Sequence, residues 1–461
     1  MNKHLTLTLT KWATLLSCVA GLAACSLLPR YERPPAPTPT AWPGQTDSTA
    51  APAVLPSWQD YFANAPLRQL IDLALANNRD LRLAVLNIEQ ARAQLGIRSA
   101  DQFPTLNAGV TGSRIPAKGG GIDSAYAAGL SVTAYEFDFF GRVASLKEQA
   151  QAQYLATTEG RNIAQISLIA TVAQTWLGLL ADEELLSVTR QTLASREESL
   201  KLIELKLKHG AASELDRQLA QTLLQSARVT LAQQERQRML DENALVLLLG
   251  QALPSQVKLS FKLSEMHLTE LPAGLPSELL VRRPDIRQAE QLLMAGNANI
   301  GAARAAFFPR ISLATSIGSA SNDLTALFTD GSWGWTLAPQ LLLPIWDAGR
   351  NQSALASAKA ARDMGVAQYE KAIQTAFREV ADSLAGRTTL TQQLHAQQAL
   401  LDAETGRSHL VKLRLDHGAA SQLDWLDAQR SLFASQQALT HTRLASLQNQ
   451  VNLYNTLGGG I

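Results

Sequence analysis

The thiol of Cys25 is the side chain best suited to chemistry in this sequence, because it follows a short apolar run that ends in Ala23 and Ala24. Small residues before a cysteine at such a place resemble the bacterial lipobox, where cleavage leaves the cysteine as an acylated N-terminus. The residue after Cys25 is Ser26 rather than Asp, as in lipoproteins that are sent to the outer membrane. The sequence therefore predicts lipidation at Cys25. A chance cysteine beside an ordinary cleavage site is the alternative.

Two histidines, His209 and His417, are the other candidates for chemistry, since an imidazole can bind a metal ion. Each follows a predicted helix, where histidine favours the helix dipole, and no acid or cysteine pattern completes a metal site. HExxH, GxSxG and P-loop patterns are absent from the sequence. We therefore expect no enzyme, no cofactor and no resident metal.

The composition favours long helices over a nucleic-acid-binding or large β protein. The 461 residues include 41 Lys and Arg against 40 Asp and Glu, and only 6% are aromatic. The basic residues Lys3 and Lys11 precede a short apolar run, which predicts a signal peptide at 1–24 and a lipid anchor with a Pro-rich tether at 25–65. No later stretch has 18 consecutive apolar residues, so a membrane role requires strands or a lipid anchor.

The elements that position these residues occur in two copies. Residues 208–216 read KHGAASELD, and residues 416–424 read DHGAASQLD, a spacing of 208. Repetition over this length indicates two copies of one supersecondary plan. We place the first repeat at 66–253 and the second at 254–461.

Proline positions indicate where long helices are possible. All 18 prolines lie within 29–66, 104–116 and 254–344. Because proline breaks helix interiors, the two proline-free stretches allow very long helices. An apolar stripe at steps of four and three residues supports a coiled-coil-like seam, formed by Ile373, Phe377, Val380 and Leu384.

Each repeat is expected to contain a helix, two strands, a long helix, a turn and a returning helix. Gly210 and Gly418 end the long helices, and Ser213 and Ser421 cap the returning ones. The first repeat is expected to have a helix at 66–100, strands at 105–115 and 125–139, a long helix at 143–208 and a helix at 213–249. The second is expected to have an equatorial segment, a helix at 284–306, strands at 310–320 and 333–346, a long helix at 350–416 and a helix at 421–457.

The lengths of these elements predict an oligomer. The helix expected at 143–208 would be about 100 Å long, which exceeds a compact domain. The strands are long enough to cross a bilayer, yet four strands cannot close a barrel, and open sheet edges in lipid are forbidden. Three copies would supply twelve strands, within the known barrel range. Two ordinary soluble hairpins on a helical protein are the alternative.

We therefore predict a mainly α fold with a β-barrel portion. The expected architecture is a trimeric 12-stranded outer-membrane β-barrel, with four strands per chain, continuous with a long α-helical coiled-coil periplasmic tunnel. The two internal repeats supply equivalent parts of it.

A family resemblance makes this prediction specific. Residues 275–287 read LPSELLVRRPDIR, which resembles the signature of NodT/OprM-type lipoproteins in the TolC-like outer-membrane factor family. YERPP at 31–35 and the strand-to-helix junctions at 135–142 and 344–350 are also similar to that family. The resemblance covers essentially the whole mature chain. It implies the outer-membrane channel of a tripartite RND-type efflux pump, a passive trimeric exit duct for small molecules that is gated at its periplasmic tip.

The resemblance also implies a location and partners. The chain would be lipid-anchored in the bacterial outer membrane and extend into the periplasm. Its partners would be two further copies in a homotrimer, a periplasmic membrane-fusion adaptor, an inner-membrane RND pump and outer-membrane lipid, but no nucleic acid. The alternatives are the duct of a type I protein secretion system and a non-conducting lipoprotein scaffold.

In this family the turn after the second long helix carries the constriction, and alignment on Gly418 implies gate acids at Asp424 and Asp427. The two are three residues apart, so they share one helix face. Three-fold symmetry would bring up to six carboxylates around a narrow axis, where they repel, raise each other's pKa and attract cations. The alternative is that these acids only favour the positive end of the helix dipole.

This sequence departs from TolC itself at the gate. Leu415 and Ala420 stand where TolC places the Tyr and Arg of its closed-state links, so those links cannot form here. Apolar contacts from Leu415 or Leu423 are expected instead. The first repeat has Leu219 where Asp427 stands in the second, which favours the second turn as the one that lines the axis.

The resemblance gives both turns a second role as docking sites for adaptor hairpins, although they could serve only to reverse the chain. Small residues allow close approach between helices, and the docking residues implied are Gly210, Ala211, Ser213, Gly418, Ala419 and Ser421. Arg282 and Arg283 could form an anion site. We favour a structural role, because Pro284 opens a helix beside them.

Overall fold

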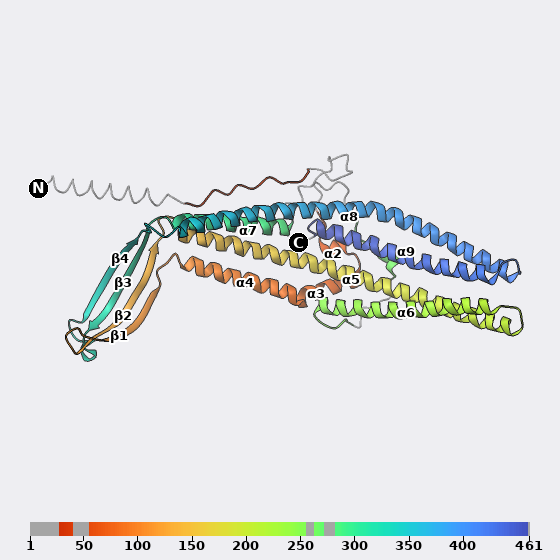
Figure 1. The fold of residues 1–461 in the computed structure, drawn as a ribbon, viewed down its shortest axis with the longest axis horizontal. Coiled ribbons are helices and arrows are strands. Elements are labelled where there is room, and N and C mark those ends of the chain that lie inside the picture. Colours follow the sequence, from red (N-terminus) through yellow and green to blue (C-terminus); the bar gives the residue numbers. More distant parts are fainter. Residues whose placement is uncertain (1–26, 40–54, 255–261, 272–281, 460–461) are drawn as a thin grey trace. The chain divides into compact units, whose positions relative to one another are not determined.

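The computed structural model describes residues 27–39, 55–254, 262–271 and 282–459 (Figure 1). The signal peptide expected at 1–24 and the lipidation at Cys25 lie outside the described residues. Residues 275–281 of the signature segment also lie outside them.

Helices make up most of the described chain. A short helix, α2 (Trp58–Tyr61), lies in the segment expected to be the Pro-rich tether. The first repeat contains α3 (Ala65–Asn77), α4 (Arg79–Ala100), β1 (Leu106–Pro116), β2 (Ile122–Phe137), α5 (Arg142–Lys208) and α6 (Glu214–Leu249). The second contains the 3-10 helix η1 (Leu263–Glu265), α7 (Pro284–Ala305), β3 (Arg310–Ser321), the 3-10 helix η3 (Leu324–Ala326), β4 (Trp333–Leu342), α8 (Arg350–Asp416) and α9 (Gln422–Thr456). Helices α5 and α8 have 67 residues each, so the two long helices match in length.

Three of the expected elements differ from their predicted bounds by more than one residue. The helix expected at 66–100 is interrupted at Asn78, whose backbone is extended and whose side chain accepts the N–H of Leu81 to cap α4. Strand β4 ends at Leu342 instead of 346, because its partner β3 begins at Arg310, directly opposite Leu342. Strand β2 begins and ends slightly earlier than expected, since its register with β1 pairs Ile122 with the last residue of that strand.

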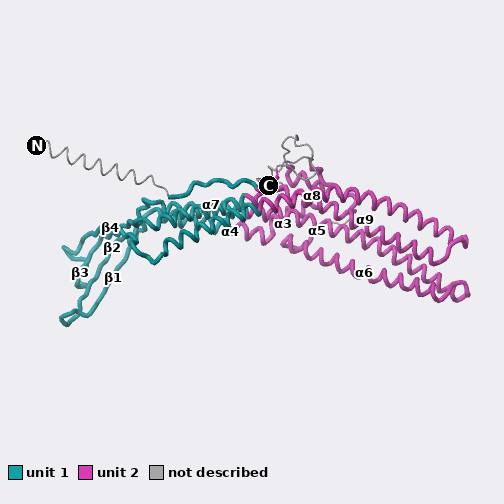
Figure 2. The backbone as a smooth tube through the Cα atoms, turned by 45° about the horizontal axis from the view of Figure 1, so that its top comes forward, with its two compact units in different colours: residues 1–36, 86–159, 287–371 teal, residues 37–85, 160–286, 372–461 magenta. Residues whose placement is uncertain are grey.

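The chain forms two compact units that do not coincide with the repeats (Figure 2). One comprises residues 1–36, 86–159 and 287–371, and the other comprises 37–85, 160–286 and 372–461. The first holds all four strands and is named here the strand unit. The second holds both helical turns and is named the turn unit. Each unit therefore draws on both repeats.

In the strand unit, the segment that precedes α2 lies against α7. The guanidinium of Arg33 pairs with Glu290 at 2.6 Å, and the Tyr31 hydroxyl donates to the same carboxylate at 3.0 Å. Two turns further along α7, Asn297 donates its side-chain N–H to the carbonyl of Pro29 at 2.8 Å. Polar side chains seven residues apart on α7 therefore hold the described start of the tether.

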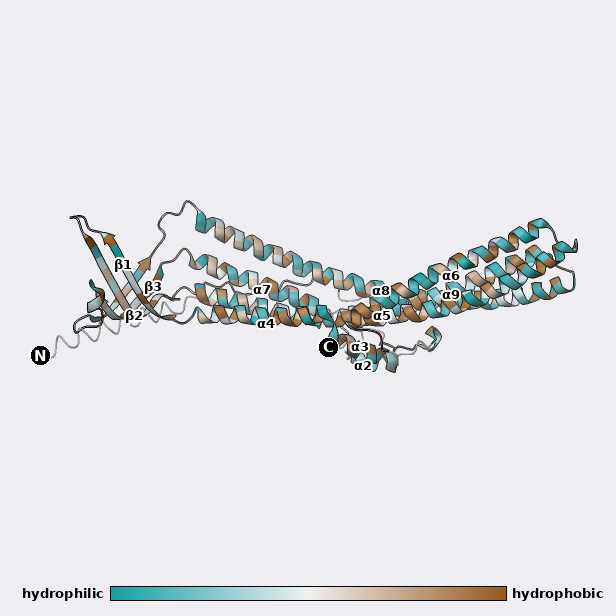
Figure 3. Cartoon of the chain, turned by 90° about the horizontal axis from the view of Figure 1, so that it is seen from below, coloured by the Kyte–Doolittle hydropathy of each residue, from teal (hydrophilic) through white to brown (hydrophobic). Residues whose placement is uncertain are grey.

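The turn unit has a dense apolar core along α5. Trp176 and Leu177 of α5 are fully buried, and the rings of Tyr61 and Tyr454 stack with centroids 4.0 Å apart. The apolar residues of α5 are visible in Figure 3. One stretch of this helix is long and apolar enough to cross a membrane by length and composition alone, but most of it is buried within the protein, as in a core helix.

Candidate functional site

The turn between α8 and α9 is built by a glycine and a serine. Gly418 has φ 73°, a left-handed conformation that glycine adopts without steric cost, and the N–H of Ala419 donates to the carbonyl of Arg414 at 2.8 Å. Ser421 then caps α9, because its hydroxyl accepts the N–H of Asp424 at 3.1 Å. The Asp424 carboxylate accepts the Ser421 N–H at 2.9 Å, which completes a capping box.

The first gate candidate, Asp424, is therefore an exposed carboxylate that serves its own helix end. The hydrogen bonds from Ser421 hold the pKa of Asp424 below its usual value. Within one chain this shift is opposite to the raised pKa expected of crowded gate acids. The reason is that the crowding expected from the sequence requires three chains, whereas the cap is complete in one.

The second gate candidate, Asp427, lies between two arginines. Its carboxylate is 3.3 Å from the guanidinium of Arg407 on α8 and 2.5 Å from that of Arg430 on α9. Arg407 also pairs with Glu404 at 2.7 Å. These four side chains form a charge-balanced row that links α8 to α9. The sequence alone does not indicate Arg407 as the partner of Asp427, because Arg407 lies 20 residues away along the chain.

The turn between α5 and α6 repeats the backbone of the second turn with different charges. Gly210 also has φ 73°, and Ser213 and Asp216 form the same capping box. Here the neighbouring charges stay within one helix, since Glu214 pairs with Arg217 at 2.5 Å. All six docking residues expected from the sequence lie exposed at these two turns, namely Gly210, Ala211, Ser213, Gly418, Ala419 and Ser421.

The four-stranded sheet of the strand unit has one polar and one apolar face. The strands are antiparallel in the order β1-β2-β3-β4, and residues paired across them share a face. One row across the four strands consists of Asn107, Ser131, Ser316 and Thr336. The adjacent row, on the opposite face, consists of Ala108, Leu130, Ile317 and Trp335. A sheet with one polar and one apolar face is typical of the wall of a membrane β-barrel, in which the polar face lines a water-filled lumen and the apolar face contacts lipid.

The edges of this sheet require further strands. Within the described residues, β1 pairs only with β2, and β4 pairs only with β3. Trp335 on β4 is 73% exposed in the single chain. An apolar face with two open edges is stable in lipid only when other strands close it.

Comparison with known proteins identifies the family. The sequence matches the family described as outer membrane efflux protein over residues 70–251 and 275–459. This chain belongs to the outer membrane efflux protein family. It is 47% identical over 452 residues to the solvent efflux pump outer membrane protein SrpC of Pseudomonas putida, across 95% of this chain and 96% of that protein. It is 45% identical to the outer membrane protein OprJ of Pseudomonas aeruginosa, across 95% and 94% of the two chains.

Solved structures agree with this assignment. A membrane protein from Pseudomonas aeruginosa matches with a TM-score of 0.88 and 43% identity, across 95% of this chain and 98% of that chain. The open state of the MtrE outer membrane channel of Neisseria gonorrhoeae matches with a TM-score of 0.87 and 38% identity, across the same shares.

The efflux-protein family confirms the main expectations from the sequence. The fold class is the trimeric 12-stranded outer-membrane β-barrel, with four strands per chain and a long helical tunnel, and the location is the outer membrane. The comparisons favour an efflux channel over a type I secretion duct or a non-conducting scaffold.

In this efflux protein an apolar cluster lies close to the turns. Leu426 of α9 is buried together with Leu200, Ile203 and Leu224 of the first hairpin. Leu423, one of the two residues expected to supply apolar contacts in the closed state, is 56% exposed in the single chain, so its contacts with other copies stay a prediction. Leu426 was not among the residues predicted from the sequence. Its position seven residues before Phe433 places both side chains on one face of α9, and this spacing could have indicated that Leu426 is buried.

His209 and His417 lie exposed at the ends of α5 and α8. Their backbone N–H groups donate to carbonyls one turn earlier, at 3.3 Å and 3.2 Å. In the part of the chain that the structure describes, no three His, Cys, Asp or Glu side chains gather as metal ligands. Their positions directly after α5 and α8 are those at which histidine favours the helix dipole.

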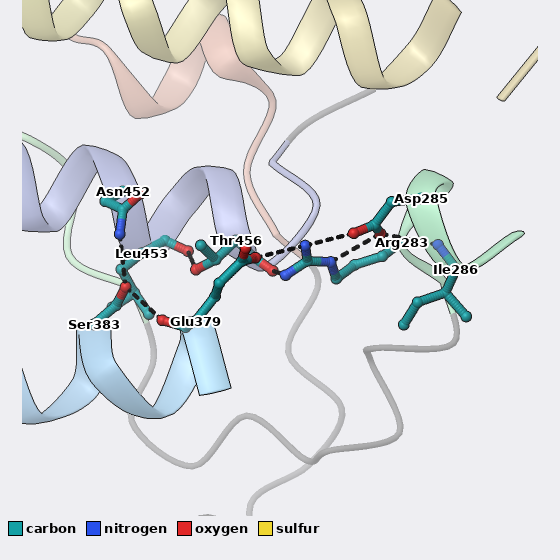
Figure 4. Close-up of polar contacts among 8 residues, drawn as sticks. All are labelled: Arg283, Asp285, Ile286, Glu379, Ser383, Asn452, Leu453 and Thr456. Carbon is teal, nitrogen blue, oxygen red and sulfur yellow. Dashed lines mark hydrogen bonds and ion pairs between the residues drawn. The ribbon is translucent and has the colours of Figure 1, made fainter. Parts of the chain in front are cut away.

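Arg283 of the signature segment links three helices of the turn unit (Figure 4). It is 8% exposed, and its guanidinium donates to Asp285 at 2.7 Å, to Glu379 of α8 at 2.8 Å and to the carbonyl of Thr456 at 2.6 Å. Two carboxylates and a helix C-terminus of its own chain therefore occupy its donors. These contacts support the structural role for Arg283 over the anion site.

Proposed function

We propose that this chain forms the passive exit duct of a tripartite RND-type efflux pump, and that Asp424 and Asp427 gate it at the α8–α9 turn. The observation that carries the gate is the Arg407–Asp427 ion pair, which ties α8 to α9 beside the capped Asp424. In a homotrimer three such turns would meet around one axis. The duct passes small molecules and performs no catalysis.

Several features support a passive duct that works together with a separate, energy-supplying pump. The relatives are named as outer membrane proteins of solvent, toluene and antibiotic efflux pumps. The sequence has no nucleotide-binding pattern, so an inner-membrane pump would supply the energy. The polar row of the sheet suits a water-filled lumen, and an acyl group on Cys25 would anchor the chain in lipid.

The two turns would also receive the hairpin tips of a periplasmic membrane-fusion adaptor. Their small exposed residues, such as Ala211 and Ala419, leave room for another helix to approach closely. Adaptor contact at the second turn would compete with the Arg407–Asp427 pair. Surface ion pairs contribute about 0–1 kcal/mol each, so docking contacts could displace them and let α8 and α9 move outward.

Ion conductance in planar bilayers tests the gate. Replacing Asp424 and Asp427 with Ala should raise the closed-state conductance several-fold, since it removes the cross-helix pair and part of the α9 cap. Light scattering on the same preparations should give the mass of a trimer, which verifies assembly of the variant.

The matched control is Asp216→Ala, which removes the same capping carboxylate from the first turn. We expect its closed-state conductance to equal that of the unmodified protein. If an assembled Asp424→Ala, Asp427→Ala trimer also keeps the original closed-state conductance, neither residue belongs to the gate.

A further inference from the structure

A cavity of about 190 Å³ lies within the turn unit, among α5, α8 and α9. Its polar lining includes Gln191, Thr192, Ser195 and Arg196 of α5, Ser408 of α8 and Gln429 of α9. Trp425 and Phe433 of α9 form part of its apolar wall. The cavity is therefore a partly polar space between helices of both repeats, and none of its lining residues is acidic.

Arg196 is the unusual member of this lining. It is only 3% exposed, and the described residues supply no carboxylate to pair with it. One guanidinium nitrogen donates to the carbonyl of Leu223 at 2.7 Å, while Nε is buried without a hydrogen-bond partner. The guanidinium carbon lies 5.0 Å from the ring centroid of Phe433. A carbonyl and an aromatic face stabilise a cation, but neither neutralises it.

Two other arginines of the same hairpin are paired with carboxylates. Arg228 pairs with Glu197 at 3.1 Å, and Arg238 pairs with Glu242 at 2.8 Å. Burial with no neutralising acid lowers the pKa of Arg196, although a guanidinium remains protonated in proteins at ordinary pH. The turn unit thus contains one deeply buried positive charge whose counter-charge is missing from the described residues.

The groups around the cavity suit an oxyanion. The Ser408 residue is 6% exposed, and the hydroxyls of Ser195 and Thr192 also line the space. Hydroxyl and amide side chains can donate hydrogen bonds to an anion, and a guanidinium pairs well with carboxylate or phosphate oxygens. Gln429 donates to Ser195 at 3.3 Å and leaves its own carbonyl oxygen unpartnered, so this amide could turn its N–H₂ group toward a ligand.

We propose that this cavity is a binding site for one small oxyanion per chain, of phosphate size or smaller, with Arg196 as its counter-charge. The anion would bridge α5 to α8 and α9 and strengthen the packing of the first helical hairpin against the second. The site is distinct from the gate acids, since none of its lining residues is Asp424 or Asp427.

Calorimetric titration of the purified full-length trimer with inorganic phosphate, in Tris-chloride buffer, tests the site. We expect saturable binding with about one phosphate per chain, and a rise of about 2–5 °C in the apparent unfolding midpoint at saturating phosphate. Parallel titrations with sulfate and acetate distinguish the source of the oxyanion. Acetate binding without phosphate binding would assign the site to carboxylates.

Arg196→Met removes the charge and keeps much of the side-chain volume. We expect this variant to lose phosphate binding and to lose the midpoint rise. In phosphate-free buffer its midpoint should equal or exceed that of the unmodified protein, because a buried unpaired charge has been replaced by an apolar side chain. Arg228→Met is the matched control, since it removes a compensated arginine from the facing helix, and its phosphate binding should be unchanged.

Ser408→Ala provides a second test if Arg196→Met does not assemble. It keeps the charge and removes one lining hydroxyl, so we expect phosphate affinity to fall by about 2- to 10-fold. The proposal is overturned if the unmodified trimer binds none of the three oxyanions saturably, or if Arg196→Met binds them as well as the unmodified trimer does. Neither outcome bears on the gate, which is measured by conductance.

Discussion

The two helical hairpins, α5–α6 and α8–α9, have the same backbone plan but different polar contacts. Both long helices have 67 residues, both turns have a glycine at φ 73°, and both returning helices begin with a Ser–Asp capping box. Yet Asp427 of the second hairpin corresponds to Leu219 of the first, at the repeat spacing of 208. The two turns therefore share their backbone geometry but differ in charge, and this difference underlies the proposal that the second turn gates the duct.

The middle of each hairpin shows the same contrast. A glycine of the long helix faces an acid or amide of the returning helix, Gly178 opposite Asp241 in the first hairpin and Gly386 opposite Asn449 in the second. Asn449 donates to the carbonyl of Ser383 at 2.9 Å, which anchors it. Asp241 instead lies beside the buried carboxylate of Asp182. Equivalent positions therefore hold a neutral anchor in one hairpin and an acid pair in the other.

The largest effect is expected from adding a methyl group at the two glycines. A Cβ at Gly386 would lie 2.3 Å from Asn449 Oδ1, whereas a Cβ at Gly178 would lie 3.1 Å from Asp241 Oδ2. Gly386→Ala should therefore destabilise the protein by about 1–3 kcal/mol through overpacking. Gly178→Ala should be nearly neutral, because the helix propensity of Ala offsets the tighter contact. Thermal unfolding of both variants checks this. Equal losses would remove the distinction between the two sites.

The second effect is a pH dependence confined to the first hairpin. Burial, and next the Asp241 carboxylate, raise the pKa of Asp182 to about 7. Because this lies above the usual Asp value of about 3.9, the contribution of Asp182 to stability is complete below about pH 4 and is lost as the pH rises toward 7. Arg238 opposes the shift, and Glu183 adds to it.

Asp241→Asn gives the first hairpin the amide that the second hairpin has at Asn449. It should reduce the loss of stability that accompanies deprotonation of Asp182. Between pH 5 and 8, we expect the unmodified protein to lose about 1–2 kcal/mol more stability than the variant. Unfolding midpoints measured across this range provide the comparison. Parallel pH profiles for the two proteins would show that Asp241 does not act on Asp182. Asn449→Asp is the converse variant and should introduce a pH dependence into the second hairpin.

The smallest effect is expected from single ion pairs at the turns. Arg407→Ala removes the link between α8 and Asp427, and Arg217→Ala removes a pair within α6. An exposed pair is worth up to about 1 kcal/mol, so Arg407→Ala should raise closed-state conductance by at most about fivefold, and less at high salt. Arg217→Ala should leave it unchanged. A matching rise in both variants would mean that the turns do not differ in gating.

Local signals were sufficient to predict most of the described fold. Helix α8 has the bounds expected from proline spacing and the glycine at its end, and α5 begins one residue earlier than expected. The break at Asn78 was missed, because the residues around it carry no proline or glycine and its capping bond depends on local geometry. The end of β4 was also misplaced, since a strand ends where its partner ends.

The sequence by itself determined the turns, their serine caps and the two long helices, because these depend on residues within a few positions of one another. Only the tertiary structure decided that Asp427 pairs with Arg407, that Leu426 joins the apolar cluster, and that Arg196 is buried with no acid beside it among the described residues. Those contacts depend on how each helix is rotated about its axis and which neighbour it meets. Packing of whole helices sets that rotation, and no short stretch of sequence encodes it.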